Sequence, residues 1–165
     1  MNKVLVAYFS CTAATKKAAK TLAKAAGADL YEIEPEVPYS SSDLNWMDSH
    51  SRSSVEMKDP ASRPKIKGGV ENMNEYDVIF VGSPNWWGTM APPVATFLTR
   101  NDVAGKTVVP FFTHGGGGMQ RCESDVRKLC PKARVLKAAT FSGGSIRSAG
   151  KAIADWVGKS VTVKK

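Results

Sequence analysis

The chain has 165 residues, 42% of them hydrophobic and 23% charged, a size that suits a single domain over residues 1–165 with a sizeable core. No apolar run approaches the roughly 18 residues of a membrane span, and three widely spaced cysteines argue against a disulfide framework, so we expect a cytoplasmic protein. The formal net charge is +8, and residues 120–165 carry the whole excess, because residues 1–119 hold 12 basic and 12 acidic side chains.

Strand and helix patterns alternate along the chain. Residues 3–9 form an apolar, β-prone run, and residues 13–26 place apolar side chains at helical spacing before Gly27, a usual helix end. Further strands are predicted at 29–33, 77–81, 106–112 and 134–139, and further helices at about 92–98, 119–129 and 145–157. Alternation of this kind implies parallel strands, right-handed crossovers and helices on both faces of an α/β sheet.

Residues 35–76 interrupt this alternation. The segment contains four prolines and begins with the serine run Ser40-Ser41-Ser42. A helix can form within residues 43–57, with Ser42 or Asp43 as its cap. We expect the remainder to be an ordered but irregular excursion.

The segment over residues 77–91 is the most informative in the chain. Its apolar run ends at Gly82-Ser83-Pro84, and the adjacent Trp86 and Trp87 follow, closed by Gly88. This pattern predicts a buried strand and then a loop at its carboxyl end, where ligands bind in open α/β sheets. A planar aromatic ligand stacked on an indole would be a partner for an exposed tryptophan. The alternative is that the tryptophans pack into the core, as we expect for one of them.

Residues 10–15 join the first strand to the first helix and read Ser10-Cys11-Thr12-Ala13-Ala14-Thr15. Hydroxyl groups and free amides at a helix N-terminus form a cradle for an anion. Neither the Walker pattern nor the dinucleotide fingerprint is present, so a terminal monophosphate is favoured over a pyrophosphate. The alternative is that Ser10 or Thr12 only caps the helix.

A third segment, Thr113-His114-Gly115-Gly116-Gly117-Gly118, follows the strand at 106–112. Its glycines allow the backbone to approach a ligand closely and to bond the edge of a heteroaromatic ring. It can instead be a flexible connection. The oxyanion loop of esterases also contains a His-Gly-Gly-Gly run, but the Gly-x-Ser-x-Gly elbow that this function requires is missing.

Two of these residues are candidates for a direct chemical role. His114 could donate a proton to a bound molecule, although a lone histidine at a strand end is more often a polar loop residue. Cys11 lies near a helix N-terminus, which would lower the pKa of its thiol, but no base is evident nearby in the sequence. No Cys and His cluster has the spacing of metal ligands, so we expect no metal site.

The three loops, in this order on five alternating strands, resemble the flavodoxin family over residues 3–158. The resemblance implies a flavodoxin-like three-layer sandwich whose five-stranded parallel sheet has the order 2-1-3-4-5, an order for which flavodoxin is itself the standard example. It also implies FMN as the cofactor, with the phosphate on residues 10–15. In this family an aromatic residue of the second loop lies against the isoalloxazine and the third loop edges it, which here implicates Pro84, Asn85, Trp86, Trp87 and Gly88, with Thr113 to Gly118.

The chain departs from the family at two points. Ala13 and Ala14 replace the usual glycine and asparagine of the phosphate loop, and the net charge is basic where electron-carrier flavodoxins are acidic. The leading hypothesis is an FMN-binding redox protein that passes electrons to a redox partner protein. The alternatives are an FMN-dependent NAD(P)H:quinone-type reductase acting on a small acceptor, and a non-redox scaffold that has lost FMN.

The basic C-terminal region has two interpretations. It can be a solvated face, or it can steer an acidic partner or a phosphorylated cosubstrate. Nucleic acid is a poorer candidate, because no aromatic residues interleave with the basic ones to form a base-stacking platform.

Overall fold

The structure is a computed structural model that describes residues 3–11, 13–59, 61–114 and 120–142. Its strands are β1 (Val4–Tyr8), β2 (Asp29–Glu32), β3 (Val78–Trp86), β4 (Thr89–Met90), β5 (Thr107–His114), β6 (Arg134–Val135) and β7 (Ala139–Ser142). Its helices are α1 (Ala13–Ala26), α2 (Arg52–Lys58), α3 (Pro92–Arg100) and α4 (Cys122–Leu129), with a 3-10 turn η1 (Met73–Glu75). None of the helices described is long and apolar enough to cross a bilayer.

The strands form one sheet in the order β2-β1-β3-β5-β6, with β7 also paired to β5 and the short β4 paired to β3. All pairs except β3–β4 are parallel. The expected order 2-1-3-4-5 is therefore confirmed, with β5 in the fourth position and β6 and β7 sharing the fifth.

The fifth predicted strand, 134–139, is divided where its neighbour contains Pro110. Val108 pairs with Val135 but Phe111 pairs with Ala139, so three residues on the outer strand face two on β5. Proline has no amide to donate to the ladder, and a bulge accommodates the missing bond. The amide of Ala138 donates instead to Oε1 of Glu123, at 2.6 Å.

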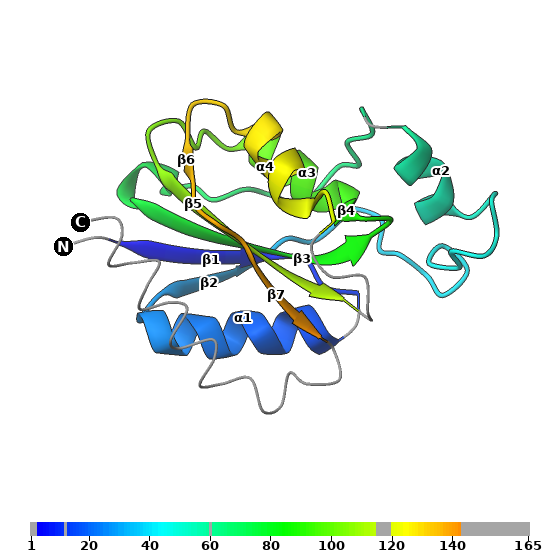
Figure 1. Cartoon of the computed structure of the whole chain (residues 1–165), viewed down its shortest axis with the longest axis horizontal. Helices are drawn as coiled ribbons and strands as arrows, with labels where there is room; N and C mark the ends of the chain where they lie inside the picture. The colour runs from blue at the N-terminus through cyan, green and yellow to red at the C-terminus, as the bar shows by residue number, and fades with distance from the viewer. Residues whose placement is uncertain (1–2, 12, 60, 115–119, 143–165) are drawn as a thin grey trace.

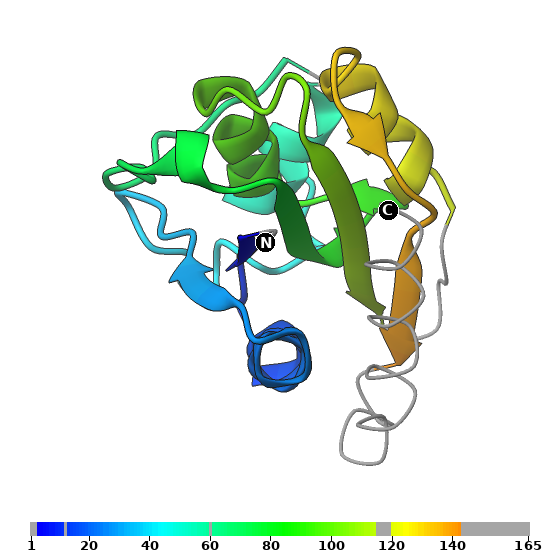
Figure 2. The same cartoon turned by 90° about the vertical axis from the view of Figure 1, so that its left-hand side faces the viewer.

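Both faces of the sheet are covered, as Figure 2 shows in a view along the strands, with α1 on one side and α3 and α4 on the other. Alternate residues of β1 separate into the two layers: Val4 and Val6 pack in the cluster under α1, and Leu5 and Ala7 pack in the cluster under α3 and α4. This alternation of apolar side chains to both faces explains why the strands are continuous hydrophobic runs.

The expected end of the third strand at Val81 is wrong, because β3 continues through Gly82-Ser83-Pro84 to Trp86. The ring of Phe111 on β5 lies over Gly82, and a Cβ at that position would come within 2.2 Å of its Cζ atom. Gly82 is therefore a packing requirement inside a strand. The fourth strand is also longer than predicted, since Thr113 and His114 are its last two residues.

The helices agree with the prediction where no side chain competes with backbone carbonyls for the backbone amides. The predicted bounds of α1 are correct, and Gly27 follows it with φ +62°. The helix expected within 43–57 is only α2, and Ser51 caps it in place of Ser42 or Asp43. The side chains of Asn45 and Asp48 accept backbone hydrogen bonds in local turns that replace the preceding helical turns.

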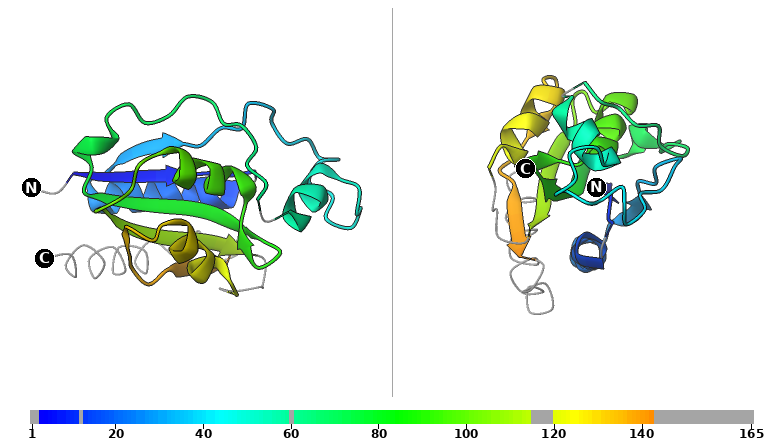
Figure 3. Two further views of the ribbon diagram at one scale, coloured as in Figure 1. Left: turned by 90° about the horizontal axis from the view of Figure 1, so that it is seen from above. Right: turned by 90° about the vertical axis from the view of Figure 1, so that its right-hand side faces the viewer.

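The rest of residues 35–76 is irregular, as predicted, with one isolated bridge between Pro35 and Ile66 in addition to α2 and η1. Figure 3 shows that α2 lies beyond the carboxyl ends of the strands. α3 begins with Pro92 as expected, and α4 begins at Cys122. The predicted helix 145–157 and the start of the one at 119–129 lie outside the described residues.

Candidate functional site

The described residues of the three predicted loops lie at the carboxyl edge of the sheet. β1, β3 and β5 are parallel and in register there, with Tyr8 beside Gly82 and Pro84 beside Thr113. In Figure 1 this edge is on the right, where the start of α1 and the β3–β4 hairpin also lie. Thr12 and Gly115 to Gly118 lie outside the described residues, so the structure places the other predicted site residues only.

The N-terminus of α1, the positive end of the helix dipole, lies at this edge of the sheet. No acidic residue occupies the first turn of the helix, and the side chains of Lys16 and Lys17 are exposed. Helix amides and the macrodipole stabilise an anion at such a position. The donor set therefore suits a phosphate that approaches along the helix axis.

The Thr15 hydroxyl connects two of the loops. Its Oγ1 lies 2.6 Å from Oγ1 of Thr113, and both side chains are buried. This bond fixes the first turn of α1 to the end of β5. In this structure Thr15 shapes the edge from beneath, and an anion there would meet the helix amides and the partly exposed Ser10.

The second loop is a tight hairpin in which Asn85 pairs with Met90 and Trp86 pairs with Thr89. The two connecting residues, Trp87 and Gly88, have φ angles of 52° and +86°, as in a type I′ turn. Glycine adopts this conformation readily, but a tryptophan does so at a cost of about 1 kcal/mol or more.

Several polar contacts hold this turn in place. The Gly88 amide donates to Oδ1 of Asn85 at 2.9 Å, and the Arg121 amide donates to the Gly88 carbonyl at 2.7 Å. The indole of Trp87 is nevertheless 46% exposed. Backbone strain at an exposed aromatic residue makes Trp87 a candidate functional position.

Trp86 has a different environment. Its ring meets those of Phe9 and Tyr39 edge-on, at centroid distances of 5.8 and 5.3 Å. The Arg52 guanidinium lies 3.9 Å from the Tyr39 ring centroid, and Glu56 accepts from both Arg52 and the Tyr39 hydroxyl. Trp86 is thus the tryptophan that packs against the core, and it anchors the excursion to the hairpin.

The expectation of a lowered thiol pKa at Cys11 is wrong. Burial raises the pKa of Cys11 to about 12, although the nearby Arg52 opposes the shift. The thiol packs against the apolar cluster rather than at the first amides of α1, which begins at Ala13. Cys11 is therefore protonated at neutral pH and is not a poised nucleophile.

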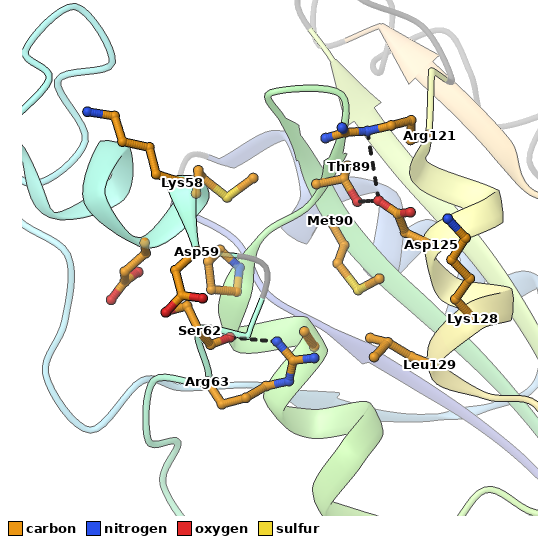
Figure 4. A pocket seen from close by; sticks show the side chains of 14 residues that line it. Lys58, Asp59, Ser62, Arg63, Thr89, Met90, Arg121, Asp125, Lys128 and Leu129 are labelled. Carbon is orange, nitrogen blue, oxygen red and sulfur yellow. Dashed lines mark hydrogen bonds and ion pairs between the residues drawn. The ribbon is translucent and has the colours of Figure 1, made fainter.

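The sequence did not predict a cavity that borders the β3–β4 hairpin, which Figure 4 shows. It has a volume of about 520 Å³ and lies between α2, β4, α3 and α4. Its walls come from four elements that are separated in sequence, so no local pattern identifies it. The charges within α4 give no indication of it either, because Glu123 and Asp125 balance Arg127 and Lys128.

His114 ends β5 and is partly exposed. Among the described residues, no group of three or more His, Cys, Asp or Glu side chains could hold a metal ion. The three cysteines are all free.

Comparison with known proteins gives one consistent result. Residues 3–160 match the family model described as Flavodoxin. The structure is similar to the crystal structure of a predicted flavoprotein from Bacteroides eggerthii (42% identity, covering 93% of this chain and 99% of that one, TM-score 0.83). It is also similar to a predicted flavoprotein from Bacteroides uniformis (38% identity, covering 94% and 97%, TM-score 0.87).

A more distant structure shares the fold. It is a flavoprotein from Lactobacillus acidophilus, crystallised in complex with FMN, with 23% identity, 90% of this chain and 98% of that chain covered, and a TM-score of 0.68. No curated protein matches the chain in sequence.

Proposed function

The chain belongs to the flavodoxin family, and from this premise we propose that it binds FMN at the carboxyl edge of its sheet and transfers electrons through the flavin. The observation that carries the proposal is Trp87, an exposed indole in a strained turn at the edge where α1 presents its N-terminus. A planar ring beside the indole and a phosphate at the helix match the two ends of FMN.

The residues at the start of α1 fit the phosphate of FMN. Hydrogen-bond donors are present there, and no carboxylate in the first turn of the helix would repel the phosphate. The first turn of α1 contains no acidic residue, and Lys16 and Lys17 add positive charge outside it. Amides at a helix N-terminus accept a dianion without a metal ion. Ser10 and Thr12 are the hydroxyl candidates, Thr12 on the strength of the sequence alone.

The residues also fit the ring. Trp87 offers a face of its indole at the hairpin tip, while Trp86 fills the space behind the hairpin and keeps it in position. Gly88 is needed at the turn for two reasons. Its backbone is left-handed, with φ +86°, and a Cβ at this position would lie only 3.2 Å from Oε1 of Gln120. The contribution of Gly115 to Gly118 rests on the sequence.

Bound FMN supplies reversible electron transfer, and the protein supplies binding, orientation and electrostatics. Apolar rings around the hairpin keep water from one side of the site. The Cys11 thiol, with its pKa raised to about 12, adds no negative charge near the flavin at neutral pH. A cytoplasmic location agrees with this function and stays a prediction.

The test is a titration of flavin-free protein with FMN and, separately, with riboflavin, followed by flavin and tryptophan fluorescence. FMN should quench both emissions, and riboflavin should bind at least about tenfold more weakly because it lacks the charge-assisted bonds of the phosphate. Unchanged fluorescence with both ligands would contradict the proposal and favour a scaffold that has lost FMN.

The electron-transfer part has its own test. Protein with FMN bound, once photoreduced without oxygen, should reduce cytochrome c at a rate that depends on the protein concentration. A flavin that reduces no acceptor would restrict the function to cofactor binding.

A second candidate function is an FMN-dependent reductase that takes electrons from NAD(P)H. It is favoured by the cavity of about 520 Å³, which borders the hairpin through Thr89 and Met90. Sustained oxidation of NADPH with a quinone acceptor would support it, and inactivity with both NADH and NADPH would exclude it.

A further inference from the structure

Two cavities lie next to each other along α2. The larger, of about 520 Å³, and a smaller one of about 250 Å³ share Met57 and Lys58 in their walls. Together they have the size of a site for a small organic molecule. The smaller cavity also includes Trp87, so the pair begins at the hairpin where the flavin ring is proposed to lie.

The smaller cavity is aromatic and apolar. Trp46 is 69% exposed, Met47 is 77% exposed, and both line it together with Trp87 and Met57. Exposed side chains of this kind that gather around one hollow mark a binding site more often than a random surface. Indole rings and thioethers favour a flat, polarisable aromatic molecule.

The larger cavity is cationic. Of the three acids in its wall, Asp125 is neutralised by Arg121 at 4.0 Å and accepts from the Thr89 hydroxyl, as Figure 4 shows. Glu56 is engaged by Arg52, which lies outside the cavity, at 3.1 Å.

Among the residues that line the larger cavity, Asp59 is then the one acid left to balance the positive charges of Lys58, Arg63 and Lys128. Lys58 donates to the carbonyl of Ser49, so its ammonium group lies by the smaller cavity, and in Figure 4 its side chain extends away from Arg63 and Lys128. An anionic group that entered from the aromatic side would meet positive charge at once.

We propose that the two cavities form one binding site for a planar aromatic acid, with its ring beside Trp46 and its sulfonate, carboxylate or phosphate in the larger cavity, on the side of Arg63 and Lys128. The binding of such an acid does not depend on the proposed flavin function, because protein side chains alone form the two cavities.

The test uses anthraquinone-2-sulfonate as the probe and 2-(hydroxymethyl)anthraquinone as its uncharged analogue. Binding to the full chain is measured by calorimetry, with and without FMN. The sulfonate should bind more tightly than the analogue, and this difference should shrink as salt increases. Equal affinities for the two probes at low salt would overturn the proposal.

Trp46→Ala should weaken binding of both probes about tenfold. The matched control is Val55→Ala, which removes another exposed apolar side chain of the excursion that lines neither cavity. A Trp46→Ala variant that binds the sulfonate as well as the control would overturn the aromatic half of the site.

Arg63→Ala combined with Lys128→Ala should weaken the sulfonate about fivefold and leave the analogue unchanged. Lys132→Ala, an exposed cation of the same region outside both cavities, is the control. Equal loss for both probes would overturn the cationic half. Probe binding without FMN binding would refute the flavin function but retain this site, and the reverse would refute this site alone.

Discussion

The middle of β3 and the tip of the β3–β4 hairpin place opposite demands on their residues. In the middle, Gly82 is buried beneath the ring of Phe111, and nothing larger fits. At the tip, Trp87 is exposed and occupies a backbone conformation that glycine would adopt with less strain. Packing requires the small residue at position 82, whereas packing does not require the large residue at position 87. This difference teaches that the middle of the strand serves the fold, whereas packing leaves the indole at the tip available for the proposed ligand.

The largest expected effect is on the packed middle. Gly82→Ala would place a Cβ 2.2 Å from Cζ of Phe111, and the overpacking should lower the free energy of unfolding by about 3 kcal/mol. Urea denaturation measures this loss.

The control for Gly82 is Gly69→Ala, where the nearest atom lies at an ordinary 3.8 Å. It should change stability by less than about 1 kcal/mol. A Gly82→Ala variant as stable as this control would show that the middle of β3 is not fixed by packing.

The second prediction concerns the bond that joins the two parts of the edge. Thr15→Val should destabilise the protein by about 2 kcal/mol, because the buried Thr113 hydroxyl loses its partner at 2.6 Å. Thr113→Val should do the same. The double variant should lose less than the sum of the two, and additive losses in denaturation would contradict the pairing.

The third prediction separates stability from function at the tip. Trp87→Gly should raise the free energy of unfolding by about 1 kcal/mol, because glycine relieves the positive φ. The same variant should weaken FMN binding about tenfold through loss of the indole face. Urea denaturation of the apoprotein and a fluorescence titration measure the two effects.

Trp86→Ala is the comparison for Trp87. It should destabilise the protein, because its ring packs against Phe9 and Tyr39. If Trp87→Gly binds FMN as tightly as the unaltered protein, the assignment of Trp87 to the flavin is wrong.

The smallest effect is expected at Cys11. The raised pKa, about 12, keeps the thiol protonated at every pH well below 12, and the thiolate forms only above it. Cys11→Ala should therefore change FMN affinity less than about twofold between pH 6 and 9, at a stability loss of about 1 kcal/mol. A titration step near pH 8 that disappears in the variant would show that the thiolate takes part.

The sequence predicts those parts of the fold that local chemistry determines. The periodicity of α1 and the stop at Gly27 gave the correct helix bounds, and alternation of elements gave the parallel sheet. The prediction from sequence failed where the conformation of a residue depends on a neighbour that is distant in the chain. Gly82 was predicted to end a strand, because its packing partner Phe111 is 29 positions away and leaves no local pattern. Pro110 lies in β5 but divides the neighbouring strand into β6 and β7.

The candidate site shows the same division. The described residues of the loops lie at the edge that strand order requires, but the different environments of the two tryptophans depend on Phe9 and Tyr39 packing against one of them. The pKa of Cys11 depends on burial in a cluster that the local motif does not reveal. The larger cavity depends on α2 and α4 lying on either side of one hairpin.

The most direct test of the flavin site is an amide and indole NMR spectrum of the labelled protein, recorded while FMN is added. We predict that the Trp87 indole, the Gly88 amide and the amides at the start of α1 shift most, with Thr113 and His114 also affected. Shifts confined to α3 and α4, or no saturable shift at the carboxyl edge, would contradict the account.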